Sequence, residues 1–394
     1  MSNSTPDPTV SRMTLLTLVL TRFVSGAPGM LFGLLLIEIS ATFGTPVGIT
    51  GQIRTVSSTI AVISALIVGI ASVKYNAISI LVAGYGLLLL SAIGSSISSS
   101  YEMMMLFFPL TGIGISMIGP MGSTLVAQYY PRERRPRAIG WMIAGGASAY
   151  LVGAQAMAFI SGIGTWRLAY YGYVIPIIIL GLLSAQLFLV KEKKNPVDTG
   201  RSTGYLEGLK SVMTNKSAFS SLIGSMLRMA SFQSVLLYSA SLFRHQFSLS
   251  REATALLVTL SALCYVVGSV FAGRIVNRMG KKRTTIIAII LAGVFVIAFT
   301  TTSSYPIAIV TYLICAFCFG TSTSSGQSLN LEQVPDYRGS MMSMSAVAGN
   351  LGAAVGSGIG GFVLLIYSYT MLGPVLGSLG LCSSLFLYFV QESI

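Results

Sequence analysis

The sequence predicts an all-α membrane protein with 12 transmembrane helices in two pseudo-symmetric six-helix bundles. Composition is the first observation behind this prediction: 53% of the 394 residues are hydrophobic and 9% are charged, whereas a soluble protein has roughly 25% charged residues. The second observation is that the apolar residues form continuous runs of membrane-spanning length. The third is one long polar stretch near the middle of the chain, which divides these runs into two sets of six.

Twelve segments have the ~20 mostly apolar residues that a membrane helix needs. In the first half, the predicted helices span 14–39, 50–72, 77–98, 103–128, 138–163 and 168–190. In the second half, they span 217–242, 252–273, 284–303, 306–330, 339–363 and 369–390. Each run is continuously apolar rather than alternating, and this excludes a β-barrel.

The longest polar interruption predicts the domain organisation. It is rich in Lys and Glu and lies between the sixth and seventh predicted helices. We therefore expect an N-terminal six-helix bundle at 1–190, a cytoplasmic inter-bundle loop at 191–216 and a C-terminal six-helix bundle at 217–394.

The two halves also resemble each other. A shift of 204 residues places Gly69 on Gly273 and Pro131 on Pro335. The same shift places Gly145 of the fifth predicted helix on a glycine of the eleventh. Parallel repeats of six-helix units are typical of carriers that work by alternating access.

The distribution of basic residues predicts the orientation. With the N-terminus in the cytoplasm, eighteen of the 24 Lys and Arg residues lie on the cytoplasmic side. Only four lie outside: Arg54, Arg167, Arg244 and Arg251. By the positive-inside rule, we expect a multi-pass protein of the plasma membrane with both termini in the cytoplasm. The same asymmetry explains the net charge of +13 without a nucleic-acid partner.

The most specific motif lies between the eighth and ninth predicted helices. It contains Gly273, Asn277, Arg278 and Gly280, followed by three basic residues. It resembles the G-x-x-x-D-R-x-G-R-R signature of the major facilitator superfamily, with Asn277 in place of Asp. The resemblance implies a loop that braces helix packing in one conformational state, and the alternative is a basic loop with a turn glycine.

A second resemblance to this family covers the fourth and fifth predicted helices. Gly112, Gly114 and Pro120 are followed by the stretch 129–135 and then by Trp166-Arg167. The Arg that many members carry near the start of helix four is missing. The resemblance spans essentially the whole chain and implies a transporter whose two bundles rock about a central cavity.

Two arginines fall deep inside predicted helices. Arg22 lies ~12 Å and Arg228 ~16 Å along their segments, at about 1.5 Å per residue, and charges at such depth are usually functional. The 204-residue shift carries Arg22 to within two residues of Arg228. A similar pair grips the anion in the family's organophosphate/phosphate exchangers, which are antiporters, and a guanidinium suits that task. The alternative is that both arginines are structural.

The other polar residues complete the predicted site. None of the 11 acidic residues lies near a predicted midplane, and Glu38 ends the first helix on the outer side. This leaves no obvious proton carrier and no counter-ion for a cationic solute. The remaining candidates either line the cavity or join helices: Gln52, Gln155, Gln233, Tyr238, Gln327, Asn330 and Asn350.

These observations favour a secondary transporter for a small solute, in particular an anion or anionic metabolite. The alternative is a drug or multisolute exporter of the same fold. An enzyme is not expected, because one His and no midplane acid leave no catalytic cluster. The four Cys and His245 provide no metal-ligand set, so we expect no metal and no cofactor. We expect a monomer in the lipid bilayer, and a co-ion or counter-ion stays an open alternative.

Overall fold

The computed structural model describes residues 12–130, 135–189 and 202–392, and regular structure in these residues is helical throughout. The first half contains these elements: α1 (Arg12–Leu34), α2 (Leu36–Phe43), α3 (Val47–Lys74), α4 (Ala77–Ile97), α5 (Tyr101–Phe107), α6 (Leu110–Tyr129), α7 (Arg135–Gly162), α8 (Trp166–Ala169), the π-helix η1 (Tyr170–Val174), α9 (Ile175–Ser184) and the π-helix η2 (Ala185–Leu189). The second half contains these: α10 (Ser202–Thr214), α11 (Lys216–Phe247), α12 (Arg251–Met279), α13 (Lys281–Thr301), α14 (Tyr305–Gln333), the 3-10 helix η3 (Pro335–Tyr337), α15 (Arg338–Ile366) and α16 (Tyr369–Tyr388).

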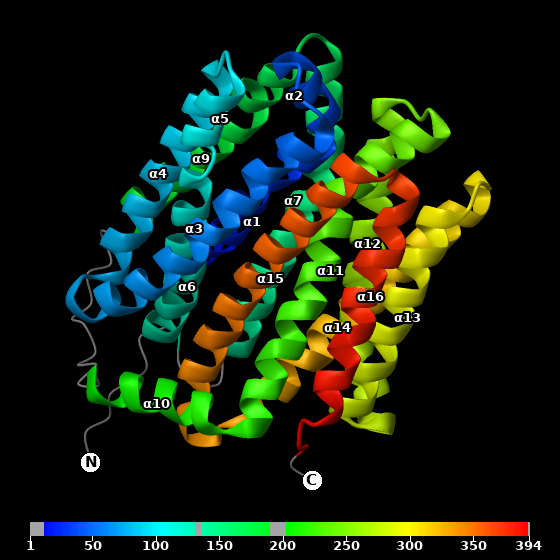
Figure 1. The fold of residues 1–394 in the computed structure, drawn as a ribbon. Coiled ribbons are helices and arrows are strands. Elements are labelled where there is room, and N and C mark those ends of the chain that lie inside the picture. The colour runs from blue at the N-terminus through cyan, green and yellow to red at the C-terminus, as the bar shows by residue number, and fades with distance from the viewer. Residues whose placement is uncertain (1–11, 131–134, 190–201, 393–394) are drawn as a thin grey trace, which may run out of the picture.

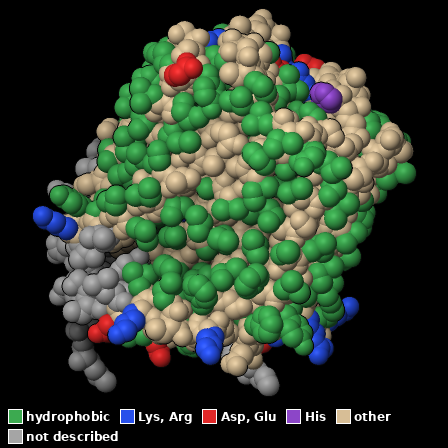
Figure 2. All heavy atoms as spheres, viewed as in Figure 1, with side chains coloured by type: hydrophobic (Ala, Val, Ile, Leu, Met, Phe, Trp, Pro, Cys, Tyr) green, Lys and Arg blue, Asp and Glu red, His purple; other side chains and the backbone are tan. Residues whose placement is uncertain are grey.

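The chain is a multi-pass membrane protein. Within the described residues, eleven spans are long and apolar enough to cross a bilayer. The twelfth long helix is α11, whose 32 residues include many serines and therefore average less apolar. Some of its buried hydroxyls bond within the helix, as Ser234 Oγ does to the Ala230 carbonyl at 2.7 Å, and others bond neighbouring helices, as Ser239 Oγ does to the Tyr312 hydroxyl at 3.1 Å. Figure 2 shows the result on one face, where hydrophobic side chains cover the middle and charged groups gather at the two ends.

The fold class predicted from the sequence is confirmed, and several predicted helices differ in detail. The first predicted helix is interrupted at Leu35, between α1 and α2. The fourth is interrupted at Phe108 and Pro109, since a proline ring clashes with the preceding turn of a helix. The stretch predicted as an inter-bundle loop contains a helix, α10, which packs beneath α15 through Gly208 and Ser340.

The long helices run between two opposite ends of the molecule (Figure 1). Helix α10 and the C-terminal end of α16 lie at one end, which we call the α10 face, and α2 lies at the other, the α2 face (Figure 1). In the first bundle, α1 packs against α7, and α6 packs against both α3 and α4. In the second bundle, α12 and α13 pack against α14, and α16 packs against α11 and α13.

Three pairs of helices join the bundles: α3 with α15, α7 with α12, and α1 with α11. Small residues allow these close approaches. A Cβ added at Gly48 of α3 would collide with the carbonyl oxygen of Gly361 on α15. Within the second bundle, a Cβ at Gly356 would likewise collide with the carbonyl oxygen of Ala230. The glycine rows in the sequence are therefore explained by backbone-to-backbone packing.

Candidate functional site

The two bundles are joined near the α2 face. Among the described residues, the side-chain hydrogen bonds between bundles lie in the halves of the helices nearer that face. Gln52 Nε2 donates to the Gly358 carbonyl at 3.1 Å, and Thr55 bonds Ser357 at 3.0 Å. Gln155 Nε2 approaches Thr259 Oγ1 at 3.5 Å between α7 and α12. In this state the α2 face is the closed end of the interface.

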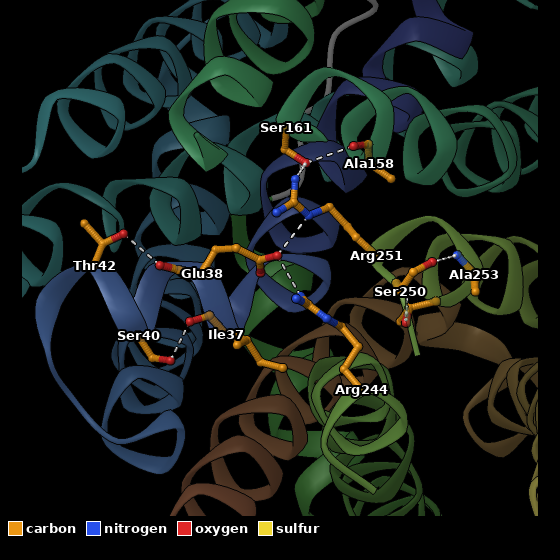
Figure 3. Close-up of polar contacts among 11 residues, drawn as sticks. Ile37, Glu38, Ser40, Thr42, Ala158, Ser161, Arg244, Ser250, Arg251 and Ala253 are labelled. Carbon is orange, nitrogen blue, oxygen red and sulfur yellow. Dashed lines mark hydrogen bonds and ion pairs between the residues drawn. The ribbon is translucent and has the colours of Figure 1, made fainter. Parts of the chain in front are cut away.

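One carboxylate reinforces this closure. Glu38 Oε1 of α2 accepts from Arg244 Nη1 at 2.7 Å and from Arg251 Nε at 2.9 Å. Arg251 Nη1 also donates to Ser161 Oγ of α7 at 3.3 Å. Figure 3 shows the two guanidinium groups converging on Glu38 from the end of α11 and the start of α12. This Glu38 bridge links segments more than 200 residues apart, and the spacing of residues in one sequence does not reveal it.

A small pocket lies directly inside this closed end. It is lined by Arg54 of α3, Tyr150 of α7 and Gln233 of α11, together with Gly29 of α1. The rest of its lining is apolar: Met30, Leu34, Leu236, Leu237, Ala240 and Val258. Both bundles therefore contribute to one pocket, which carries a guanidinium, a phenol and an amide. We call it the interface pocket.

The position of Arg54 corrects a prediction. From the sequence, Arg54 was counted on the outer side, because the predicted helix began at residue 50 and left Arg54 only about one turn from its outer end. Helix α3 begins at Val47, so Arg54 lies two turns inside it and faces the neighbouring bundle. The turn-like residues Pro46 and Gly48 concealed this earlier start: Pro46 is the N-cap, and Gly48 is a helix-contact residue.

Arg22 and Arg228 are not brought together in this state. The Arg22 side chain is exposed, on the half of α1 nearer the α10 face, and its Nη2 reaches Ser123 Oγ of α6 at 3.4 Å. Arg228 is 3% exposed, and its guanidinium packs against Gly326 of α14. Nη1 of Arg228 has no hydrogen-bond partner within the described part of the chain. Arg22 therefore reaches solvent, whereas Arg228 points into the second bundle.

Of the other predicted site residues, four connect helices. Gln52 and Gln155 join the two bundles, as described above. Tyr238 is 1% exposed and donates its hydroxyl proton to the Ser357 carbonyl at 2.9 Å. Asn330 is buried and its Nδ2 donates to Ser225 and Ser345, so it ties α14 to α11 and α15.

The three remaining polar candidates occupy different surroundings. Gln233 lines the interface pocket beside Arg54. Gln327 is exposed on α14, and Asn350 is half-buried on α15. Only Gln233 is therefore brought next to a membrane-embedded cation.

The motif between α12 and α13 forms a tight turn. Gly280 has a φ of +83°, a conformation that disfavours residues with a Cβ, and its N–H bonds the Val276 carbonyl at 2.8 Å. Gly273, Asn277 and Arg278 are exposed in this state.

An acidic partner for this turn comes from elsewhere in the chain. The Glu392 carboxylate accepts the backbone N–H groups of Lys281 at 2.5 Å and Lys282 at 3.3 Å. It thereby caps the N-terminus of α13, where a negative charge is favourable. The Lys281 ammonium also pairs with Glu332 at the end of α14. Two distant carboxylates therefore surround a motif in which Asn277 has replaced the usual Asp.

A helical membrane protein with two bundles around a polar interface pocket is the class that this fold and site define. The chain belongs to the Major Facilitator Superfamily, whose family model matches residues 18–244 and 221–393.

Comparison with individual relatives supports a transporter. A probable 4-methylmuconolactone transporter of Cupriavidus pinatubonensis is 22% identical over 371 residues, covering 88% of this chain and 85% of that protein. The synaptic vesicular amine transporter of Mus musculus is 22% identical over 326 residues, covering 79% and 60%. The crystal structure of the nucleoside transporter NupG superposes with a TM-score of 0.76 at 14% identity, covering 96% and 100%. At this identity the structural likeness shows the fold alone.

Proposed function

We propose that the chain moves a small organic anion across the plasma membrane by alternating exposure of the space between its bundles. The observation that carries the proposal is the charge balance inside the membrane. Arg22, Arg54 and Arg228 lie within spanning helices, and no acidic side chain of the described residues forms an ion pair with any of them.

The acidic residues in the described part of the chain lie near helix ends or in the short helix α10, away from these arginines. Glu102 and Glu252 lie in the first turns of α5 and α12, and Glu332 lies in the last turn of α14. Glu38 is already held by two arginines at the α2 face. An unpaired cation in a low-dielectric interior is costly, and an incoming anion would relieve that cost.

The state of the interface supports alternating access. The bundles are hydrogen-bonded near the α2 face, whereas Arg22, nearer the α10 face, is exposed. We assign the α10 face to the cytoplasm, from the basic-residue count, and this structure to the inward-facing state. A solute from that side would meet Arg22 first and the interface pocket next.

The division of the chain follows the same scheme. We propose bundles at 1–190 and 217–394, with α10 lying in the linker 191–216 between them. Rocking of the two bundles would then break the α2-face contacts and close the opposite end. The α12–α13 turn, with Gly273, Asn277, Arg278 and Gly280, would brace one of the two states.

The second candidate is a drug or multisolute exporter of the same fold. Two observations favour it: six of the ten residues that line the interface pocket are apolar, and one relative carries amines. In that case the three arginines would be structural, and lipophilic cations would be transported.

Uptake into proteoliposomes distinguishes the two candidates. The purified protein would be reconstituted and given matched labelled solutes that differ in charge: benzoate, phthalate, phenyl phosphate, benzamide and benzyltrimethylammonium. The proposal expects saturable uptake of at least one anion and none of the cation. Uptake of the cation alone would support the exporter.

A further inference from the structure

We propose that Arg54, Tyr150 and Gln233 form the subsite for the charged group of the solute, and that this group is a single carboxylate on an apolar body. The proposal rests on the proposed anion transport and adds to it a location and a substrate class. It also replaces a topological assignment, because the sequence had placed Arg54 outside the membrane.

The guanidinium of Arg54 is held against a helix backbone. A Cβ built on Gly29 of α1 would lie 2.8 Å from Arg54 Nη1 and 3.2 Å from its Cζ. A Cβ at this position would displace the guanidinium, so Gly29 lets the end of the Arg54 side chain lie close to the backbone of α1, in the pocket that α11 also lines. An oriented planar fork can bind both oxygens of a carboxylate at once.

The guanidinium is also available for a ligand. No hydrogen bond or ion pair joins Arg54 to another described side chain, and the neutral phenol of Tyr150 lines the same pocket. The nearby acid, Glu38, is bound to Arg244 and Arg251. An anion is therefore the partner that this pocket lacks.

The pocket spans the moving interface. Arg54 and Tyr150 belong to α3 and α7 of the first bundle, whereas Gln233 belongs to α11 of the second. A carboxylate that accepts from Arg54 and Gln233 together would contact both bundles at once. Binding at this place can therefore change the relative stability of the two states, which a carrier requires.

The lining restricts the substrate class. One cation faces the pocket, beside the neutral phenol of Tyr150 and the amide of Gln233, and six of the ten lining residues are Met, Leu, Ala or Val. A second negative charge, as in a phosphate monoester or a dicarboxylate, would be desolvated against these apolar side chains without a partner. A monocarboxylate with an apolar body would place its charge beside Arg54 and its body against the apolar side chains.

The pocket is narrow in this state and has room for only about one water molecule. A solute larger than water therefore fits only when the bundles move from this arrangement. We expect binding to shift the population away from the closed α2 face, and this gives the test a readout besides transport.

The test measures benzoate binding by calorimetry to the detergent-purified full chain, with benzamide and phthalate as matched probes. We expect wild-type protein to bind benzoate at least tenfold more tightly than either probe. Arg54→Gln should weaken benzoate binding at least tenfold, Arg54→Lys less, and Gly29→Ala should weaken it by displacing the guanidinium. The matched control is Arg274→Gln, on an exposed arginine of α12, which should bind as wild type does.

Three outcomes would overturn the subsite. Wild-type binding by Arg54→Gln protein that elutes and melts normally would show that Arg54 is not the anion partner. Uptake of phthalate or phenyl phosphate but not benzoate would reject the monocarboxylate while leaving anion transport intact. Absence of benzoate binding by wild-type protein would also reject a subsite for a monocarboxylate. Failure of every anion in the uptake panel would instead contradict the proposed function itself.

Discussion

Arg22, Arg54 and Arg228 lie about two turns or more from the ends of membrane-spanning helices, and we propose different roles for them from their surroundings. Arg22 is exposed toward the α10 face, Arg54 faces the interface pocket, and Arg228 is buried against Gly326. An exposed positive charge attracts anions over about 8 Å at physiological salt. Arg22 is therefore suited to capture, whereas Arg54 is placed to hold the solute between the bundles. Arg228 has no opening to the interface in this state and is the weakest of the three candidates.

The first prediction concerns Arg22. Replacing it by Gln should raise the half-saturating anion concentration several-fold, with a smaller effect on the maximal rate, because capture weakens while the pocket is unchanged. Proteoliposome uptake over a range of anion concentrations measures both quantities. The control is Ser123→Ala, which removes only the hydroxyl 3.4 Å from the guanidinium and should leave both quantities near wild type. An unchanged concentration dependence in Arg22→Gln would reject the capture role.

At the scale of helices, closure of the α2 face depends on a few polar contacts. The Glu38 bridge joins α2 to the ends of α11 and α12, and it is partly exposed. Each such pair contributes about 1 kcal/mol or less. A contact of this size can hold one state and still break during each cycle. Backbone packing such as that of Gly48 against Gly361 adds a close fit to the same end.

The second prediction is that Glu38→Gln loosens this end. A neutral amide loses both ion pairs, so the state that is open at the α2 face should become more populated. Maleimide labelling of Leu34→Cys, a buried residue that lines the interface pocket, should then become several-fold faster from that face. Labelling of chains without this added Cys is subtracted. Glu252→Gln, an exposed carboxylate one residue after Arg251, is the control and should not change the labelling rate. Equal labelling rates in Glu38→Gln and wild type would show that the bridge does not hold the face closed.

The third prediction concerns the turn between α12 and α13. Gly280→Ala should destabilise the protein by about 1–3 kcal/mol, because a Cβ is strained at its backbone angles and would press on the Glu392 carboxylate. Transport should fall as well if this turn braces one state. Gly86→Ala, on α4 and outside the motif, meets no neighbouring atom and should have little effect on either quantity. Thermal unfolding and proteoliposome uptake are measured for both variants. Similar stabilities and transport rates in the two would show that the motif is only a basic loop with no bracing role.

At the scale of the molecule, the sequence predicted the fold well because apolar length is a local property. The predicted helix at 77–98 matches α4 within one residue at each end. The seventh predicted helix stopped at 242, because the residues that follow include the polar Arg244 and His245. Helix α11 continues to Phe247, and its last turn lies at the α2 face. A hydropathy pattern does not detect the part of a helix that extends beyond the apolar layer of the membrane.

The site was less predictable, because it depends on contacts between distant segments. Arg22 and Arg228 were recognised from their depth, but only the fold shows that one is exposed and the other buried. Arg54 was missed because Pro46 concealed the start of its helix. The partners of Glu38 lie in the second bundle, and nothing in the local sequence connects them.

The fourth prediction is the orientation of the whole chain. The α10 face should be cytoplasmic, since eighteen of the 24 basic residues were assigned to that side. A membrane-impermeant maleimide applied to intact cells should label Ser248→Cys, between α11 and α12, but not Ser202→Cys, at the start of α10. Labelling of Ser202→Cys from outside would invert the topology.

The most direct test of anion transport compares two aromatic solutes of opposite charge in one preparation. Proteoliposomes containing the wild-type chain are given labelled benzoate or labelled benzyltrimethylammonium, and protein-free liposomes provide the background. We expect saturable benzoate uptake that Arg54→Gln abolishes and Arg274→Gln preserves, with no uptake of the cation above background. Transport of the cation, at equal rates in wild-type and Arg54→Gln protein and without benzoate uptake, would contradict anion transport.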